Sequence, residues 1–131
     1  MRLEKDGTRT VIAEKYKGQR FSGPNDLVYR SDGTLYFTET IWGLRGARDK
    51  LRSGERELPY TGVFAVKEGV TSLVVSEEQL GGMPNGLAFS PDEQILYVNG
   101  GDKGIMRYDV KPDGTLGAGS MIIAGMGRTL T

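Results

Sequence analysis

The sequence predicts an all-β protein in which a unit of about 60 residues occurs twice. Twenty glycines separate short apolar runs, and no stretch of ten residues keeps the 3.6-residue periodicity of a helix. Two stretches also repeat the order Pro-Asn, apolar run, turn, apolar run. Asn25 and Asn85 are 60 residues apart, whereas Leu35 and Leu96 are 61 apart, so the second copy has one extra residue in its turn.

The composition narrows the kinds of site that the chain can carry. Its 131 residues suffice for about one domain with a sizeable core. Seventeen basic and seventeen acidic residues cancel, which argues against a nucleic-acid partner. The sequence has no cysteine and no histidine, which excludes disulfides, thiolate or imidazole metal ligands and a Ser-His-Asp triad. Any metal ion would therefore be held by oxygen atoms.

The first residues show no targeting signal. Met1 is followed by the charged residues Arg2, Glu4, Lys5 and Asp6 without an apolar segment, so we expect neither a signal peptide nor a membrane span. Together with the absence of cysteine, this favours a cytoplasmic location and argues against a membrane partner.

Ten strands are expected from short runs of apolar or β-branched residues bounded by turn residues. In order they cover residues 2–5, 8–13, 25–30, 34–39, 62–67, 70–75, 85–89, 95–99, 105–110 and 120–124. The polar residues 14–23 are expected to connect two units, because Pro24 disfavours helix at the residue before it. The connection 40–61 is long and contains the only tryptophan, Trp42, and its charge run 45–57 is most simply a solvated loop.

Four short antiparallel strands at this period are typical of a β-propeller blade, which buries its faces mainly against neighbouring blades. The strands group into a half blade over residues 1–14, a blade over 24–76 and a blade over 84–124. The predicted fold is therefore a single partial β-propeller domain of about two and a half four-stranded blades. Such a chain leaves apolar blade faces uncovered, so we expect it to form a homo-oligomer. The residues expected on blade faces are Leu27, Tyr29, Tyr36, Phe64, Leu87, Phe89 and Tyr97.

The repeated asparagines are candidate metal ligands. Asn25 and Asn85 each stand at the start of an innermost strand, where a short amide side chain can point along the ring axis and two such side chains can converge. Amide oxygens suit a hard cation such as calcium or magnesium. The alternative is that each asparagine only binds the backbone of its own turn.

Three segments carry a family resemblance, and they read PNDLVYRSDGTLYFTE, RELPYTGVFAV and PNGLAFSPDEQILYVNG. In this order they resemble the senescence-marker-protein/gluconolactonase family of six-bladed, metal-dependent lactonases, and the similarity runs from about Leu3 to Ala124. The resemblance implies a hydrolase that acts on the carboxylic ester bond of a small-molecule lactone. It also implies a divalent metal cofactor, with calcium favoured and zinc, magnesium and manganese as alternatives.

The resemblance further implies a set of ligands spread over several blades. In the family, a Glu of the first blade, Asn residues of two middle blades and an Asp of a later blade hold the metal, and the Asp is the expected proton acceptor. Asn25 and Asn85 match the two middle positions, so the Glu is expected before Met1 and the catalytic Asp beyond the C-terminus. The only Pro-Asp-Gly triplet after Asn85, at residues 112–114, falls in an outer hairpin turn. The chain thus resembles a middle slice of a lactonase.

Four further residues are candidates for substrate binding. Asp26 could add a carboxylate to the site, although an acidic residue after Asn is also common in turns. Glu39 occupies a place where the family commonly has Asp, and Trp42 could either wall the mouth of the site or cap a blade interface. Asn99 ends an inner strand where relatives often place an acidic residue, which makes it a candidate to support the metal ligands.

The leading functional hypothesis is a fragment of a metal-dependent sugar-lactone hydrolase. A different class, a non-catalytic propeller that binds a ligand or partner through its blade ends, is the alternative. A strictosidine-synthase-like propeller, which has a similar blade pattern without this metal set, is the third hypothesis.

Overall fold

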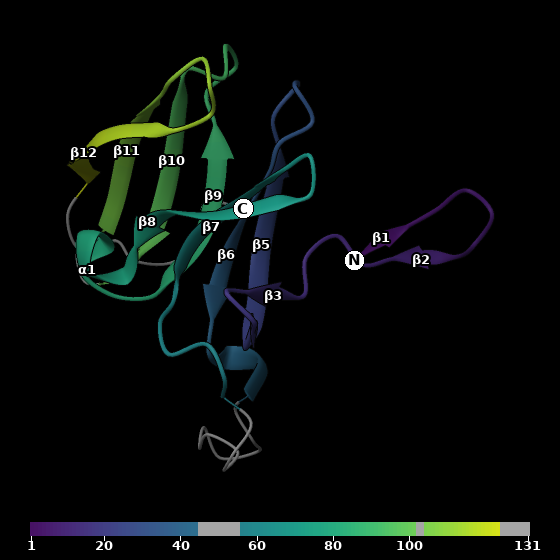
Figure 1. Ribbon diagram of the computed structural model, residues 1–131. Helices are drawn as coiled ribbons and strands as arrows, with labels where there is room; N and C mark the ends of the chain where they lie inside the picture. Colours follow the sequence, from purple (N-terminus) through teal and green to yellow (C-terminus); the bar gives the residue numbers. More distant parts are fainter. Residues whose placement is uncertain (45–55, 102–103, 124–131) are drawn as a thin grey trace.

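The computed structural model describes residues 1–44, 56–101 and 104–123. In these ranges the chain forms twelve strands, one α-helix and one 3-10 helix (Figure 1). The strands are β1 (Arg2–Leu3), β2 (Arg9–Thr10), β3 (Lys15–Tyr16), β4 (Gln19–Arg20), β5 (Gly23–Tyr29), β6 (Leu35–Thr40), β7 (Gly62–Lys67), β8 (Val70–Ser76), β9 (Pro84–Phe89), β10 (Ile95–Gly100), β11 (Gly104–Val110) and β12 (Leu116–Ile123). The helices are η1 (Trp42–Leu44) and α1 (Glu77–Leu80).

Two four-stranded antiparallel sheets form the body of the molecule. The first sheet has the order β5-β6-β7-β8 and the second has the order β9-β10-β11-β12, so each follows the order of the chain. Figure 1 shows β9 beside β5 and β6, which is where the two sheets meet. The predicted all-β fold, a partial propeller of four-stranded blades, is confirmed.

The strands bury alternate residues on the two faces of the first sheet. Tyr36 belongs to a cluster that fills the space between the two sheets, together with Leu87, Leu96 and Val98. Its neighbour Phe37 belongs to a second cluster on the other face of the first sheet. That second cluster is covered by the partly buried residues Ile12, Ala13, Tyr16, Phe21, Tyr60 and Leu73.

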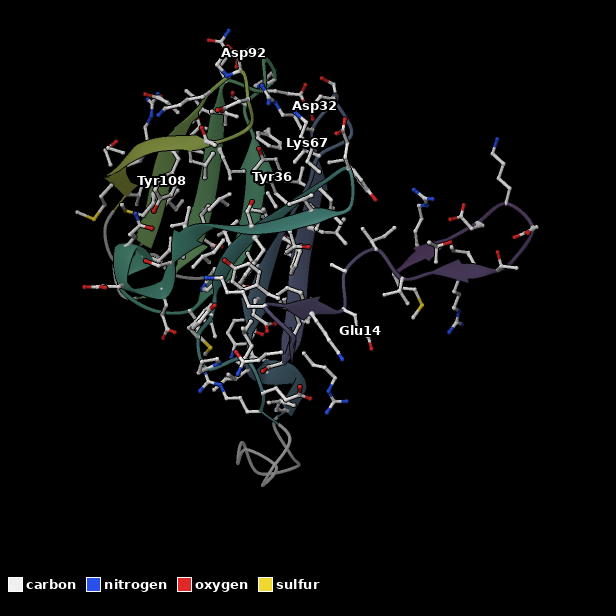
Figure 2. All side chains as sticks on the ribbon, in the orientation of Figure 1. Glu14, Asp32, Tyr36, Lys67, Asp92 and Tyr108 are labelled. Carbon is white, nitrogen blue, oxygen red and sulfur yellow. The ribbon has the colours of Figure 1, made fainter. Side chains whose placement is uncertain are left out.

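The hairpin turns share one side-chain device. Asp6, Asp32 and Asp113 each precede Gly-Thr, and each accepts a hydrogen bond from the backbone N–H of that threonine at 2.9–3.0 Å. Asp92 accepts in the same way from the N–H of Gln94 at 3.1 Å. The pKa of all four carboxyl groups is lowered below the ordinary aspartate value. The largest cause is a side-chain hydrogen bond from Thr8, Ser90 and Thr115 for Asp6, Asp92 and Asp113, and the backbone N–H of Thr34 for Asp32. Figure 2 shows Asp32 and Asp92 at the same end of the two sheets.

The N-terminal hairpin is shorter than predicted. Its strands cover residues 2–3 and 9–10 instead of 2–5 and 8–13, because Glu4 already begins the turn by donating its N–H to the Thr8 carbonyl. The pair forms a two-stranded sheet that projects away from the two larger sheets in Figure 1. Leu3 is 72% exposed, so this hairpin contributes little to the core.

The prediction of ten strands was wrong, since the described residues contain twelve. The additional pair, β3 and β4, lies in the stretch 14–23 that was predicted to be a connection. Its turn consists of Lys17 and Gly18, which both have positive φ values, of 50° and 80°. This is the backbone conformation of a two-residue hairpin turn, for which the glycine is the sequence signal.

Two other segments differ from the expectation. Residues 77–80 form α1, which the sequence pattern did not predict because one helical turn is too short to show a period. It begins with a capping box between Ser76 and Gln79 and ends at Gly81, which has a left-handed conformation. The last strand starts earlier than predicted, at Leu116, and its predicted end at Ala124 lies outside the described residues.

The connection between the first two hairpins of the first sheet is described only in part. Most of the predicted charge run, residues 45–55, lies outside the described residues. After it, Glu57 forms an ion pair with Arg20, and Leu58 is fully buried in the second cluster. No helix in the described ranges is long and apolar enough to cross a bilayer.

Candidate functional site

The same irregularity occurs at the start of both first strands. Between Pro24 and Leu27, β5 has one more residue than the facing part of β6, and between Pro84 and Leu87, β9 has one more residue than the facing part of β10. One extra residue in one strand is a β-bulge, which turns side chains away from their regular direction. The bulge therefore contains Asn25 and Asp26 in the first sheet, and Asn85 and Gly86 in the second.

Each bulge is held by a side-chain oxygen from the neighbouring strand. The N–H of Asp26 donates to Thr38 Oγ1 at 3.0 Å, and the N–H of Gly86 donates to Asn99 Oδ1 at 2.6 Å. Thr38 and Asn99 are 61 residues apart, which is the spacing of the repeat over this part of the unit. Asn99 is only 1% exposed. Its amide therefore supports the backbone next to Asn85, while its predicted role in supporting a metal site stays a prediction.

The two repeated asparagines meet across the junction of the sheets. Asn25 Nδ2 donates to Asn85 Oδ1 at 2.8 Å. Asn25 is exposed and Asn85 is half-buried, so the pair lies at the surface, at the end of the sheets where β5 and β9 begin. We call this end the site end. The predicted convergence of the two amides is therefore seen, and their role as metal ligands stays a prediction.

Asp26 also links the two sheets. Its Oδ1 accepts from the N–H of Leu27 at 2.9 Å, and its Oδ2 accepts from the N–H of Leu87 in β9 at 3.1 Å. Both carboxylate oxygens thus bind backbone donors, one in each sheet. This carboxylate lies beside the asparagine pair, and its side chain is half-buried.

Glu39 is buried beneath the start of β5. Its side chain is 0% exposed and accepts hydrogen bonds from the backbone N–H groups of Ser22 and Gly23 at 2.6 and 2.8 Å. Burial raises the pKa of Glu39 above the ordinary value for glutamate, and the two N–H donors partly offset this effect. Among the described contacts, the carboxylate holds the backbone that leads into Asn25, and it forms no hydrogen bond with either asparagine of the pair.

Trp42 lies in η1, which packs against the start of β5. Its N–H donates to Thr40 Oγ1 at 3.2 Å, and its side chain is 39% exposed. The next residue, Gly43, lies so close to Ser22 that a Cβ atom there would stand 2.7 Å from the Ser22 carbonyl oxygen. Figure 1 shows η1 directly beyond the ends of β5 and β6. The structure therefore places Trp42 at the site end, without a hydrogen bond to the asparagine pair in the described residues.

The donor atoms at the site end suit a hard cation. The amides of Asn25 and Asn85 supply neutral oxygens, which are the kind of ligand that calcium and magnesium prefer. In the described ranges, no group of three or more His, Cys, Asp or Glu side chains is placed to hold a metal ion. A small cavity of about 100 Å³ adjoins Asn25 and Asp26, and Asn85 is not among its lining residues. It is lined by Met1, Ile12, Ala13, Pro24, Asn25, Asp26, Leu27, Leu35 and Phe37.

Comparison with protein families places the chain among known relatives. The family model described as SMP-30/Gluconolactonase/LRE-like region matches residues 1–129. The chain belongs to this family. The resemblance that the sequence segments indicated is thereby confirmed, and it extends over nearly the whole chain.

Individual members of the SMP-30/gluconolactonase family agree with this assignment. A gluconolactonase of Zymomonas mobilis subsp. mobilis (strain ATCC 31821 / ZM4 / CP4) is 42% identical over 96 residues, which are 72% of this chain and 25% of that protein. The solved structure of a gluconolactonase from Xanthomonas campestris has a TM-score of 0.74 and 32% identity, over 90% of this chain and 39% of that one. A second solved structure, of a putative gluconolactonase, also has a TM-score of 0.74, with 30% identity over 91% of this chain and 40% of that one.

The chain spans a quarter of the length of the Zymomonas protein and about two fifths of each solved structure. Within that share, the sequence had not indicated two of the groups that shape the site. Thr38 and the N–H of Leu87 both bind Asp26. The position of Thr38 could have been found from the repeat, because it corresponds to Asn99, whereas the Leu87 contact depends on how the sheets pack.

Proposed function

We propose that this chain contributes part of the active site of a metal-dependent hydrolase of sugar lactones, with Asn25 and Asn85 as two ligands of a divalent cation. The observation that carries the proposal is the contact between Asn25 Nδ2 and Asn85 Oδ1 at 2.8 Å. The two residues come from separate sheets and occupy the same position in the repeat, so their amides share one point at the site end. The substrate class follows from the relatives, which are named gluconolactonases.

The role of the chain in this reaction is to hold two neutral oxygen donors in place. Thr38 and Asn99 fix the two bulges from behind, and Glu39 holds the segment that leads into Asn25. A divalent cation bound there would polarise the lactone carbonyl and lower the pKa of a bound water. Calcium is the favoured ion because amide oxygens are hard ligands, and zinc, magnesium and manganese are the alternatives. The proton acceptor is not assigned to a residue of this sequence.

Calcium binding to the 131-residue chain tests the proposal. Titration calorimetry should show one calcium site that is weakened by Asn25→Ala and by Asn85→Ala, because each substitution removes one ligand oxygen. Gln94→Ala is the matched control, since it removes an exposed amide at the opposite end of the second sheet. Equal calcium affinity in all four proteins would contradict the proposal and would favour a non-catalytic binding module.

A further inference from the structure

The proposed ligands stand on two different sheets, so their relative position depends on the junction between β5 and β9. The hydrogen bond between Asn25 and Asn85 is one link across this junction at the site end. It joins two side chains that lie at the surface, where water competes for the same donors and acceptors. A second link at the site end would keep the two amides in one arrangement when a cation or water replaces their mutual hydrogen bond.

Asp26 supplies a link of a different kind. Its Oδ2 accepts from the backbone N–H of Leu87, two residues after Asn85, while its own backbone N–H donates to Thr38 Oγ1. The carboxylate is thus fixed to the first sheet and reaches the backbone of the second. Hydrogen bonds from N–H groups to an ionised carboxylate are about twice as strong as neutral ones. Leu87 is 3% exposed and belongs to the core between the sheets, so the Asp26 carboxylate binds a buried part of β9.

The repeat shows that this link is specific to one copy. The residue that corresponds to Asp26 in the second sheet is Gly86, which has no side chain. Both copies share one other contact. In the first copy the N–H of Asp26 donates to Thr38, and in the second copy the N–H of Gly86 donates to Asn99. A carboxylate at position 26 therefore adds a function that the bulge itself does not require.

We propose that Asp26 is a positioning residue that holds Asn25 and Asn85 together by tying the bulge of β5 to the backbone of β9. This inference deepens the proposed function and rests on it for the role of the two asparagines. Both oxygens of the carboxylate already accept backbone hydrogen bonds, at 2.9 Å from Leu27 and 3.1 Å from Leu87. Asp26 thus acts on the cation through the two amides that it aligns.

The test measures the asparagine contact directly. The chain has only three asparagines and three glutamines, so the side-chain amide signals of Asn25 and Asn85 can be assigned in a ¹⁵N NMR spectrum. A nuclear Overhauser effect between the Asn25 amide protons and the Asn85 β protons reports the contact. It should be lost in Asp26→Ala and kept in part in Asp26→Asn, whose amide oxygen can still accept from Leu87. Asp32→Asn is the control, because Asp32 binds Thr34 in its own turn at the other end of the sheet.

Calcium affinity provides the second readout. Asp26→Ala should weaken calcium binding by about 10- to 100-fold, the range for groups that orient metal ligands, and the control should stay within about twofold of the wild type. If the wild type binds no calcium but Asp26→Ala still abolishes the Asn25–Asn85 signal, the positioning role stands and the proposed function fails. If the signal persists in Asp26→Ala, the positioning role is wrong whether or not affinity falls. Should Asp26→Ala not fold, an unchanged signal in Asp26→Asn overturns the proposal and a weakened one supports it.

Discussion

The hydroxyl of Tyr36 donates a hydrogen bond to the carbonyl oxygen of Gly114 at 2.6 Å, and this bond joins the interior of the first sheet to the outer turn of the second. Tyr36, which is labelled in Figure 2, is fully buried. Its ring packs edge to face against Phe89, with the ring centres 5.2 Å apart. Burial raises the pKa of this phenol above the ordinary tyrosine value, so the hydroxyl stays protonated and remains a donor. The triplet 112–114, which the sequence placed in an outer turn, thus helps to fix the junction of the two sheets.

Tyr36→Phe should lower the free energy of unfolding by about 1–3 kcal/mol, because it leaves the Gly114 carbonyl without this buried donor. Urea denaturation measures the change. Tyr97→Phe is the control, since Tyr97 holds the corresponding position of the second copy and is only half-buried. We expect the control to change stability by less than about 0.5 kcal/mol. Equal effects of the two substitutions would show that the Gly114 bond is not a significant link.

The end of β10 should be sensitive to a single methyl group. Gly100 has a φ of 147°, and a Cβ atom there would overlap the carbonyl oxygen of Met83 and the start of β9. Gly100→Ala should therefore destabilise the fold by about 2 kcal/mol or more and displace Asn85. Gly33→Ala is the control, because Gly33 has a φ of 89° but open space around the Cβ position. Thermal unfolding of both variants separates the steric effect from the cost of the backbone conformation alone.

Glu39 should make stability depend on pH in an unusual direction for a carboxyl group. Burial raises its folded-state pKa above the ordinary value of 4.5. Its contribution to stability is therefore fully present below the unfolded pKa and is lost as the pH rises through the folded pKa. The difference in unfolding free energy between the wild type and Glu39→Gln should fall as the pH rises above about 4.5. Denaturant titrations at several pH values measure it, and a difference that grows with pH would show that the N–H donors outweigh burial.

The sequence could predict the features that depend on the repeat. The spacing of Asn25 and Asn85 placed both residues at the same point of consecutive four-stranded units, and their contact follows from that placement. The contact between Asp26 and Leu87 could not be predicted, because it joins a side chain to the backbone of another sheet and leaves no residue pattern. Glu39 was expected near the substrate, and only the structure shows that its carboxylate is buried on backbone N–H groups. The hairpin of β3 and β4 was missed because its residues are mostly polar.

The 131-residue chain alone should hydrolyse D-glucono-1,5-lactone no faster than metal-containing buffer does. Asn25 and Asn85 offer two neutral oxygens, whereas calcium takes six to eight oxygen ligands, so the proposed cation would be held weakly by this chain alone. The chain also spans only 39% of the solved Xanthomonas gluconolactonase. A pH-stat assay with calcium, zinc or manganese decides the matter. A metal-dependent rate that Asn85→Ala abolishes would show that the chain supplies enough of the site by itself.

Exposed apolar residues on two surfaces should make the isolated chain self-associate. On β5, Leu27 and Tyr29 are 55% and 47% exposed, and on β12, Met121 and Ile122 are 54% and 46% exposed. Tyr36, Phe64 and Leu87, which were also expected on blade faces, are buried inside the chain, so they add no exposed area to these two surfaces. Burial of apolar surface contributes roughly 25 cal/mol per Å², which favours pairing of these surfaces between copies.

Light scattering after size exclusion should show species larger than the 14.3 kDa monomer, with association reduced by Leu27→Ser or Ile122→Ser. Val70→Ser is the control, since Val70 is 69% exposed at the start of β8 and belongs to neither β5 nor β12. A monodisperse monomer with cooperative thermal unfolding would show that these surfaces do not drive association.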